Sequence, residues 1–215
     1  MVSLKLDEIH IQPKIYYNSK KLGGYADNKL NEPATQVQAF MISSLMSKYK
    51  DVVKLIPVKS NTVEFLYNAI MEVLTDLQEI GYKICCITGD NSKVNRGCFL
   101  KLLSESKDKN YFILPGKDIR TYIMFDAPHM IKCVRNNWLN VKNSSKTLEM
   151  PNFYDQTKTD NASFKLLRDI YNSQIGMIVK TGYTYNYETM YPKCIERQKV
   201  NLALNVLMKS SHQQY

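Results

Sequence analysis

Two stretches of this chain repeat one order of elements: an apolar strand, an aspartate at its end, and then a helix. Residues 82–90 end in aspartate and precede a helix expected over about residues 92–103. Residues 121–126 also end in aspartate, and a helix expected over about residues 128–139 follows, with a proline in its first turn. Strands that alternate with helices in this way predict an α/β fold with parallel strands in one sheet.

The chain before this repeat predicts several strands and one long helix. We expect Asn61 to cap the helix, with Glu64 three residues later, and Gly81 to end it. Apolar side chains recur at helical spacing between these ends, so the helix belongs to the core and carries no assigned chemistry. The sheet then has an antiparallel start and parallel additions. The expected strands are residues 4–11, 35–46 and 51–58, with a small hairpin between residues 14–17 and 22–25.

The charge of the chain favours an anionic partner. It has 29 basic and 20 acidic residues and a formal net charge of +9, and nucleic acid is the commonest partner of such a protein. A merely soluble basic protein is the alternative. The five cysteines form no C-x-x-C pair and the three histidines lie far apart, so no zinc site is expected. No apolar run is long enough to span a membrane, so no membrane partner is expected.

Asp7 and Asp90 are the candidate catalytic and metal-binding residues. Asp7 interrupts an apolar strand, where a carboxylate is costly unless it is paired, bound to a metal or facing water. Two carboxylates on neighbouring strands repel each other and therefore suit a divalent cation between them. Three alternatives stay open from the residues alone: Asp7 on a water-facing edge strand, Glu8 as the ligand from the opposite strand face, and Asp90 as a plain helix cap.

Cationic residues follow both strand-end aspartates. Lys93 and Arg96 come directly after Asp90 and suit a loop that faces the phosphates of a nucleic acid. Lys132 and Arg135, on the later helix, are also candidate residues for binding nucleic acid.

Asp126 begins an accessory candidate group. His129 and Lys132 share one face of the expected helix, and Arg135 lies beside them. Such a face could orient a phosphate next to two carboxylates. A helix cap at Asp126 and a solvated polar stripe are the alternatives.

The character of the chain changes near residue 141. Residues 143–146 have the polar composition of a linker. The remainder predicts short helices and no strand. We therefore expect one domain over residues 1–140 and the start of a second, mainly helical one over residues 141–215.

The sequence resembles the P-element and THAP-type DNA transposases. Residues 6–11 are similar to the opening of their ribonuclease H-like domain, and residues 61–99 to its helix, strand and acid-containing loop. Residues 125–137 resemble the family signature D-x-x-H-x-x-K-x-x-R-N. The resemblance implies an α/β fold with a ribonuclease H-like mixed sheet and flanking helices, followed by the start of a mainly α insertion domain.

The resemblance also implies a function. Family members cut DNA and transfer strands with three acids and two metal ions, and Asp7 and Asp90 match the first two acids. The implied cofactor is Mg²⁺ or Mn²⁺. Residues 191–208 resemble the insertion domain, which implies GTP binding. The third acid, a glutamate, follows that domain in the family, so we expect this chain to be incomplete and inactive alone.

The alternative to an incomplete transposase is a non-enzymatic nucleic-acid-binding module derived from one. DNA is the expected partner in either case, and association between copies of the chain is a candidate. The family resemblance and the reduced state expected of the cysteines favour a nuclear location.

Overall fold

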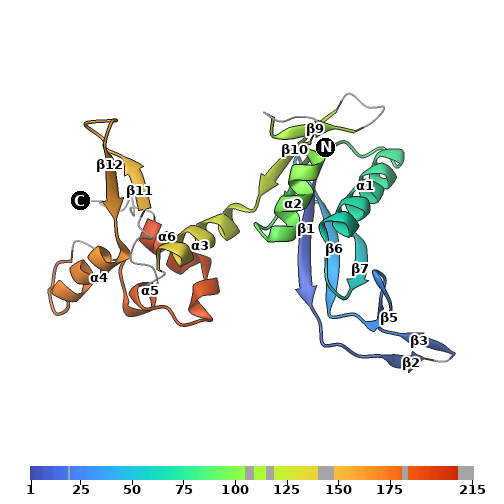
Figure 1. Cartoon of the computed structure of the whole chain (residues 1–215), viewed down its shortest axis with the longest axis horizontal. Helices are drawn as coiled ribbons and strands as arrows, with labels where there is room; N and C mark the ends of the chain where they lie inside the picture. Colours follow the sequence, from blue (N-terminus) through green and yellow to red (C-terminus); the bar gives the residue numbers. More distant parts are fainter. Residues whose placement is uncertain (19, 105–108, 115–118, 140–147, 181–183, 208–215) are drawn as a thin grey trace. The chain divides into compact units, whose positions relative to one another are not determined.

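The computed structural model describes the chain except for residues 19, 105–108, 115–118, 140–147, 181–183 and 208–215. The chain divides into two compact units, Met1–Asp126 and Ala127–Tyr215 (Figure 1). The boundary that we expected near residue 140 therefore falls before the helix α3 (Ala127–Trp138). This helix packs against α6 (Val200–Leu207), so it belongs to the second unit.

The first unit is built on a mixed six-stranded sheet, which confirms the predicted α/β fold. The strands β7, β6 and β1 form an antiparallel part, and β1, β8 and β10 form a parallel part. β1 (Val2–His10) pairs antiparallel with β6 (Gln36–Ser44) and parallel with β8 (Ile84–Gly89), and β8 pairs parallel with β10 (Arg120–Phe125). The edge strand β9 was not predicted, since three residues give no readable pattern. The spatial order is β7 (Lys50–Val58), β6 (Gln36–Ser44), β1 (Val2–His10), β8 (Ile84–Gly89), β10 (Arg120–Phe125) and β9 (Tyr111–Ile113).

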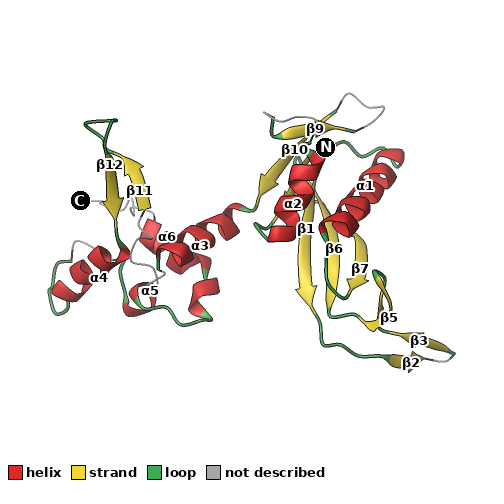
Figure 2. Ribbon diagram, viewed as in Figure 1, coloured by secondary structure: helices red, strands yellow, loops and turns green. Residues whose placement is uncertain are grey.

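Two helices cover one face of this sheet (Figure 2). They are α1 (Val63–Glu79) and α2 (Lys93–Leu102). Leu66, Ile70 and Leu74 of α1 are fully buried, and each such side chain contributes on the order of 1.5–3 kcal/mol before entropy is subtracted. Their partners in the sheet include Leu4, Phe40 and Ile87. Within the described part of the first unit, no helix covers the opposite face.

The start of α1 differs from the sequence prediction. Thr62 caps the helix, because its side chain accepts a hydrogen bond from the backbone N–H of Phe65. Asn61 instead turns its amide toward the end of β1. Gly81 follows the helix with a φ of 100°, a left-handed conformation that glycine adopts without strain, so the predicted stop is correct.

An excursion of two small hairpins joins β1 to β6. The first pairs β2 (Tyr16–Asn18) with β3 (Lys21–Gly23), as the sequence predicts. The second pairs β4 (Tyr25–Ala26) with β5 (Lys29–Pro33). We call residues 14–33 the ribbon. In Figure 1 its β2–β3 end extends away from the sheet of this unit.

The second unit is mostly helical but also contains a hairpin. Trp138 packs edge-on against Phe164, and its indole N–H donates to the carbonyl of Ala162 at 2.7 Å. The hairpin of β11 (Leu148–Pro151) and β12 (Thr159–Ala162) was not predicted, because its short polar strands carry no apolar alternation. Among the described helices, none is both long and apolar enough to cross a membrane. The other elements are α4 (Phe164–Ser173), α5 (Tyr187–Met190) and a 3-10 turn, Glu196–Gln198.

Candidate active site

The strand register brings Asp7 level with Asp90. Lys5 of β1 pairs with Thr88 of β8 in a parallel ladder, and two further residues along each strand lead to the two aspartates. Alternate residues of β1 face opposite sides of the sheet, and those that face the helices, such as Leu4 and Leu6, are buried. Asp7 is therefore exposed on the face that no described helix of this unit covers.

A buried asparagine orients the carboxylate of Asp90. Oδ1 of Asp90 accepts from the side-chain amide of Asn95 at 2.6 Å and from the backbone N–H of Ser92 at 3.0 Å. Ser92 caps α2 through its own hydroxyl, so Asp90 is not the helix cap that we considered as an alternative. The second carboxylate oxygen, Oδ2, takes part in none of the hydrogen bonds found between described residues. That oxygen can serve a cation.

Gly89 makes room for this arrangement. A Cβ atom at position 89 would lie 3.2 Å from Nδ2 of Asn95 and 3.1 Å from Cζ of Phe99. Both distances are tighter than ordinary van der Waals contact. A glycine directly before Asp90 therefore lets the amide of Asn95 approach the strand end.

Glu8, the alternative ligand, is engaged elsewhere. Its Oε1 accepts from the side-chain amide of Asn61 at 2.8 Å, and the same amide donates to Gln38 at 2.6 Å. Gln38 is almost fully buried and also donates to the backbone carbonyl of Asp7 at 3.1 Å. This network joins Glu8 to the helix-covered side of the sheet. Asp7 is left as the exposed carboxylate of β1, and its Oδ1 accepts only the neighbouring backbone N–H, of Glu8, at 2.9 Å among the described contacts.

Asp126 lies at the same level on the next strand. Phe125 pairs with Gly89, and the backbone N–H of Asp126 donates to the carbonyl of Gly89 at 2.9 Å. The three aspartates therefore follow one another across β1, β8 and β10. Even so, the described residues contain no group of three or more acidic, histidine or cysteine side chains that could hold a metal ion.

Two carboxylates at one level still fit a hard divalent cation. Mg²⁺ is commonly bound through one or two carboxylates together with water and substrate phosphates. Asp7 is exposed, Asp90 is oriented, and both offer the oxygen ligands that such ions prefer. Asp7 and Asp90 are therefore the candidate ligands for such an ion.

The predicted cationic residues are placed very differently from one another. Lys93 and Arg96 are exposed on the first turn of α2, directly after the candidate site. His129 and Lys132 are half-buried on α3 in the second unit. The prediction that Arg135 offers a surface cation is wrong, because the residue is buried with 0% of its surface exposed.

Arg135 instead joins α3 to the segment around Arg197 within the second unit. Its guanidinium donates to the backbone carbonyl of Arg197 at 2.9 Å, and the side-chain amide of Asn136 donates to the same carbonyl at 3.3 Å. Burial, with a smaller contribution from the nearby charge of Arg197, lowers the pKa of Arg135 from its ordinary value. Helical spacing alone does not predict this, since the buried contact comes from a segment 62 residues later.

The cysteines near the site are not poised as nucleophiles. Burial raises the pKa of Cys98 to about 12. Burial and the neighbouring Cys85 raise the pKa of Cys86 to about 11. Both thiols are protonated at neutral pH, whereas nucleophilic cysteines have lowered values.

The mixed sheet with helices on one face gives the first unit an RNase H-like fold. Residues 1–103 match the family model described as the TNP-like, RNase H N-terminal domain. The whole chain is similar to a chain of the Drosophila P element transposase strand transfer complex, with a TM-score of 0.72 and 20% sequence identity. That match covers 96% of this chain and 42% of the other.

The structural match shows an RNase H-like fold, and the family-model match adds that residues 1–103 are similar to the RNase H N-terminal domain of TNP-like proteins. The chain spans less than half the length of the transposase chain that it matches. No curated protein matches the sequence.

Proposed function

We propose that this chain is the part of a DNA transposase that binds DNA and holds a divalent cation, Mg²⁺ or Mn²⁺, at Asp7 and Asp90 for phosphodiester cleavage and strand transfer. The observation that carries the proposal is the parallel pairing of Lys5 in β1 with Thr88 in β8, two residues before Asp7 and Asp90. The structural relative belongs to a strand transfer complex, which supports DNA as the partner of this chain.

Each residue of the site has a separate task in this proposal. Asp7 and Asp90 bind the cation, and Asn95 keeps the carboxylate of Asp90 turned toward it. Lys93 and Arg96, exposed beside Asp90, contact phosphates of the bound strand. A cation held by Asp7 and Asp90 would supply Lewis-acid activation of water or of a 3′-hydroxyl and stabilisation of the leaving oxygen.

Further assignments are carried over from the sequence, GTP binding through the family resemblance and the others also through residue patterns. Asp126, His129 and Lys132 stay accessory candidates, GTP binding is proposed for the second unit, and a nuclear location is proposed for the protein. Association between copies of the chain is also proposed. The alternative function, a nucleic-acid-binding module without catalysis, would keep the fold and the basic surface but would not need the two carboxylates to bind a cation.

Cation binding separates these two functions. Titration of Mn²⁺ followed by electron paramagnetic resonance should show one or more sites on the unaltered chain. Asp7→Asn and Asp90→Asn should each lower the affinity by at least about tenfold, because even the loss of a residue that only orients a ligand has an effect of that size. The matched control is Asp76→Asn, an exposed aspartate on α1, which should bind Mn²⁺ like the unaltered chain.

The same samples test catalysis. We expect no DNA cleavage by these 215 residues alone with Mg²⁺ or Mn²⁺, because the described acids do not form a group of three. Equal Mn²⁺ affinity in all four proteins would contradict the metal assignment and favour the non-catalytic module. Metal-dependent nicking that is lost in both asparagine variants would contradict the expected inactivity and make Asp126 the candidate third ligand.

A further inference from the structure

The ribbon leaves the sheet at the same end as the candidate site. It follows β1 directly, and Asp7 lies close to the end of that strand, which runs Val2–His10. The ribbon then returns to β6, whose first residue, Gln36, pairs with His10. The base of the ribbon therefore lies close to the strand end that carries Asp7, and the β2–β3 end extends away from the sheet (Figure 1).

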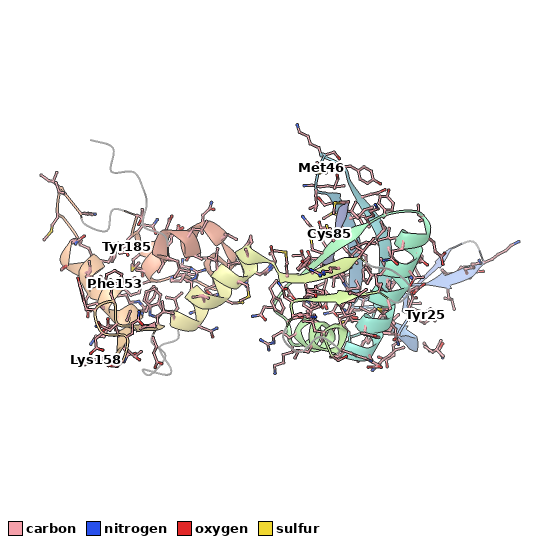
Figure 3. All side chains as sticks on the ribbon, turned by 90° about the horizontal axis from the view of Figure 1, so that it is seen from above. Tyr25, Met46, Cys85, Phe153, Lys158 and Tyr185 are labelled. Atoms are coloured by element: carbon pink, nitrogen blue, oxygen red, sulfur yellow. The ribbon has the colours of Figure 1, made fainter. Side chains whose placement is uncertain are left out.

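The base of the ribbon is anchored to the rest of the unit. The side-chain amide of Asn28 donates to the carbonyl of Ser60 at 2.7 Å, and its oxygen accepts from the backbone N–H of Lys59 at 2.9 Å. Gly24 has a φ of +94°, and a Cβ there would lie 2.0 Å from the carbonyl oxygen of Lys14. Only glycine fits that crossing of two backbones. Tyr25, labelled in Figure 3, belongs to this base.

The end of the ribbon presents tyrosine rings to solvent. Tyr16 pairs with Gly23 across the hairpin, and a Cβ at position 23 would lie 2.7 Å from Cζ of the ring. The ring therefore lies directly over the glycine, which holds it in place. Tyr17 pairs with Leu22 and has 71% of its surface exposed. Exposed aromatic faces of this kind are stacking surfaces for unpaired bases.

Positive charge runs along the ribbon, with Lys20 and Lys21 at its end and Lys14 at its base. Residues 14–26 contain no acidic residue. The ion pairs of this region lie at the base, where Glu32 contacts Lys29 at 3.5 Å and Lys59 at 3.8 Å. None of the ion pairs between described residues involves Lys14, Lys20 or Lys21.

We infer that the ribbon binds the DNA strand that flanks the reacting phosphodiester, with its lysines on phosphates and with Tyr16 and Tyr17 against unpaired bases. The inference rests on the proposed function for the identity of the partner. Exposed lysines combined with aromatic rings fit a single strand of nucleic acid, which offers both charge and base faces. Protein interfaces are depleted of lysine at their core, so the exposed Lys14, Lys20 and Lys21 favour nucleic acid over a protein partner.

The charge part of the inference is tested by fluorescence anisotropy on the 215-residue chain, with a DNA duplex that carries a single-stranded flank. The triple variant Lys14→Ala, Lys20→Ala, Lys21→Ala should reduce the slope of log affinity against log salt by about two, since each phosphate contact on a single strand contributes about 0.7. The control triple is Lys48→Ala, Lys50→Ala, Lys83→Ala. These exposed lysines lie at the other end of the sheet, near Val2, and should leave the slope unchanged.

The stacking part is tested with Tyr17. Tyr17→Ala should weaken binding to the flanked duplex by about tenfold and leave binding to a blunt duplex unchanged, whereas Tyr17→Phe should bind both like the unaltered chain. Circular dichroism spectra and Mn²⁺ titration of every variant check that the fold and the candidate site are intact.

The outcomes separate this inference from the proposed function. If the unaltered chain binds DNA but both lysine triples change the salt slope equally, or neither changes it, the ribbon inference is overturned and the proposed function stands. If the ribbon variants behave as expected while Asp7→Asn and Asp90→Asn bind Mn²⁺ normally, the ribbon inference stands and the metal assignment fails. A chain that binds no DNA at low salt overturns both.

Discussion

At the scale of single residues, Asn95 links the stability of the helix start to the geometry of a candidate ligand. Its amide nitrogen lies 2.6 Å from Oδ1 of Asp90, while its own Oδ1 is buried without a hydrogen-bond partner among the described residues. Replacement by alanine removes a favourable bond to a carboxylate and also removes an unsatisfied buried oxygen. These two effects on the free energy of unfolding have opposite signs.

We therefore predict that Asn95→Ala changes stability by less than about 1.5 kcal/mol but lowers Mn²⁺ affinity by about tenfold. Urea unfolding and Mn²⁺ titration measure the two effects. Asn68→Ala, at an exposed position of α1, is the control and should change neither. A variant that loses stability and keeps its Mn²⁺ affinity would show that Asn95 serves the fold and not the ligand.

At the scale of elements, two neighbouring residues at the start of α1, Asn61 and Thr62, have different roles. The hydroxyl of Thr62 accepts from the backbone N–H of Phe65 at 3.2 Å, and the amide of Asn61 contacts Glu8 and Gln38. Capping satisfies a helix N–H that would otherwise have no partner. The network of Asn61 instead joins the loop before α1 to the end of β1, near the candidate site.

Thr62→Ala should therefore lower the free energy of unfolding by about 1 kcal/mol, the usual effect of losing a cap. Chemical denaturation measures it, and Ser60→Ala, an exposed neighbour, should have almost no effect. If Asn61→Ala gave the capping loss and Thr62→Ala gave none, Asn61 would be the cap, as the sequence pattern predicts.

At the scale of the first unit as a whole, the sheet face opposite the described helices carries exposed apolar side chains on two of its strands. Leu55 pairs with Ala39, which pairs with Asp7, so Leu55 lies on the face opposite the described helices. Met124 is paired with Thr88, which lies beside Lys5 on that same face. Leu55 is 57% exposed and Met124 is 54% exposed. Exposed apolar side chains on a sheet face favour association.

We predict that the chain self-associates as its concentration rises and that Leu55→Lys combined with Met124→Lys reduces this. Sedimentation velocity over a range of concentrations measures the association. The matched control combines Ile80→Lys and Leu100→Lys, two exposed apolar residues at the end of α1 and on α2. Equal association of the two double variants would show that the sheet face is not responsible.

The sequence by itself determined the longer elements. Strand and helix periodicity are local properties, so the segments of β1, β8 and β10, with Asp7 inside the first and Asp90 at the end of the second, could be predicted. The P-element-type resemblance was readable for the same reason, since its motifs lie within single segments. The short strands β9, β11 and β12 gave no such signal.

Only the tertiary structure decided which side chains are accessible and what they contact. Arg135 and Lys132 look alike in the sequence. Arg135, however, is buried and donates to the carbonyl of Arg197, far along the chain. Glu8 and Asp7 are adjacent, and the network of Asn61 and Gln38 separates their roles. Burial and hydrogen bonding depend on segments distant in sequence, and no local pattern records which segments will meet.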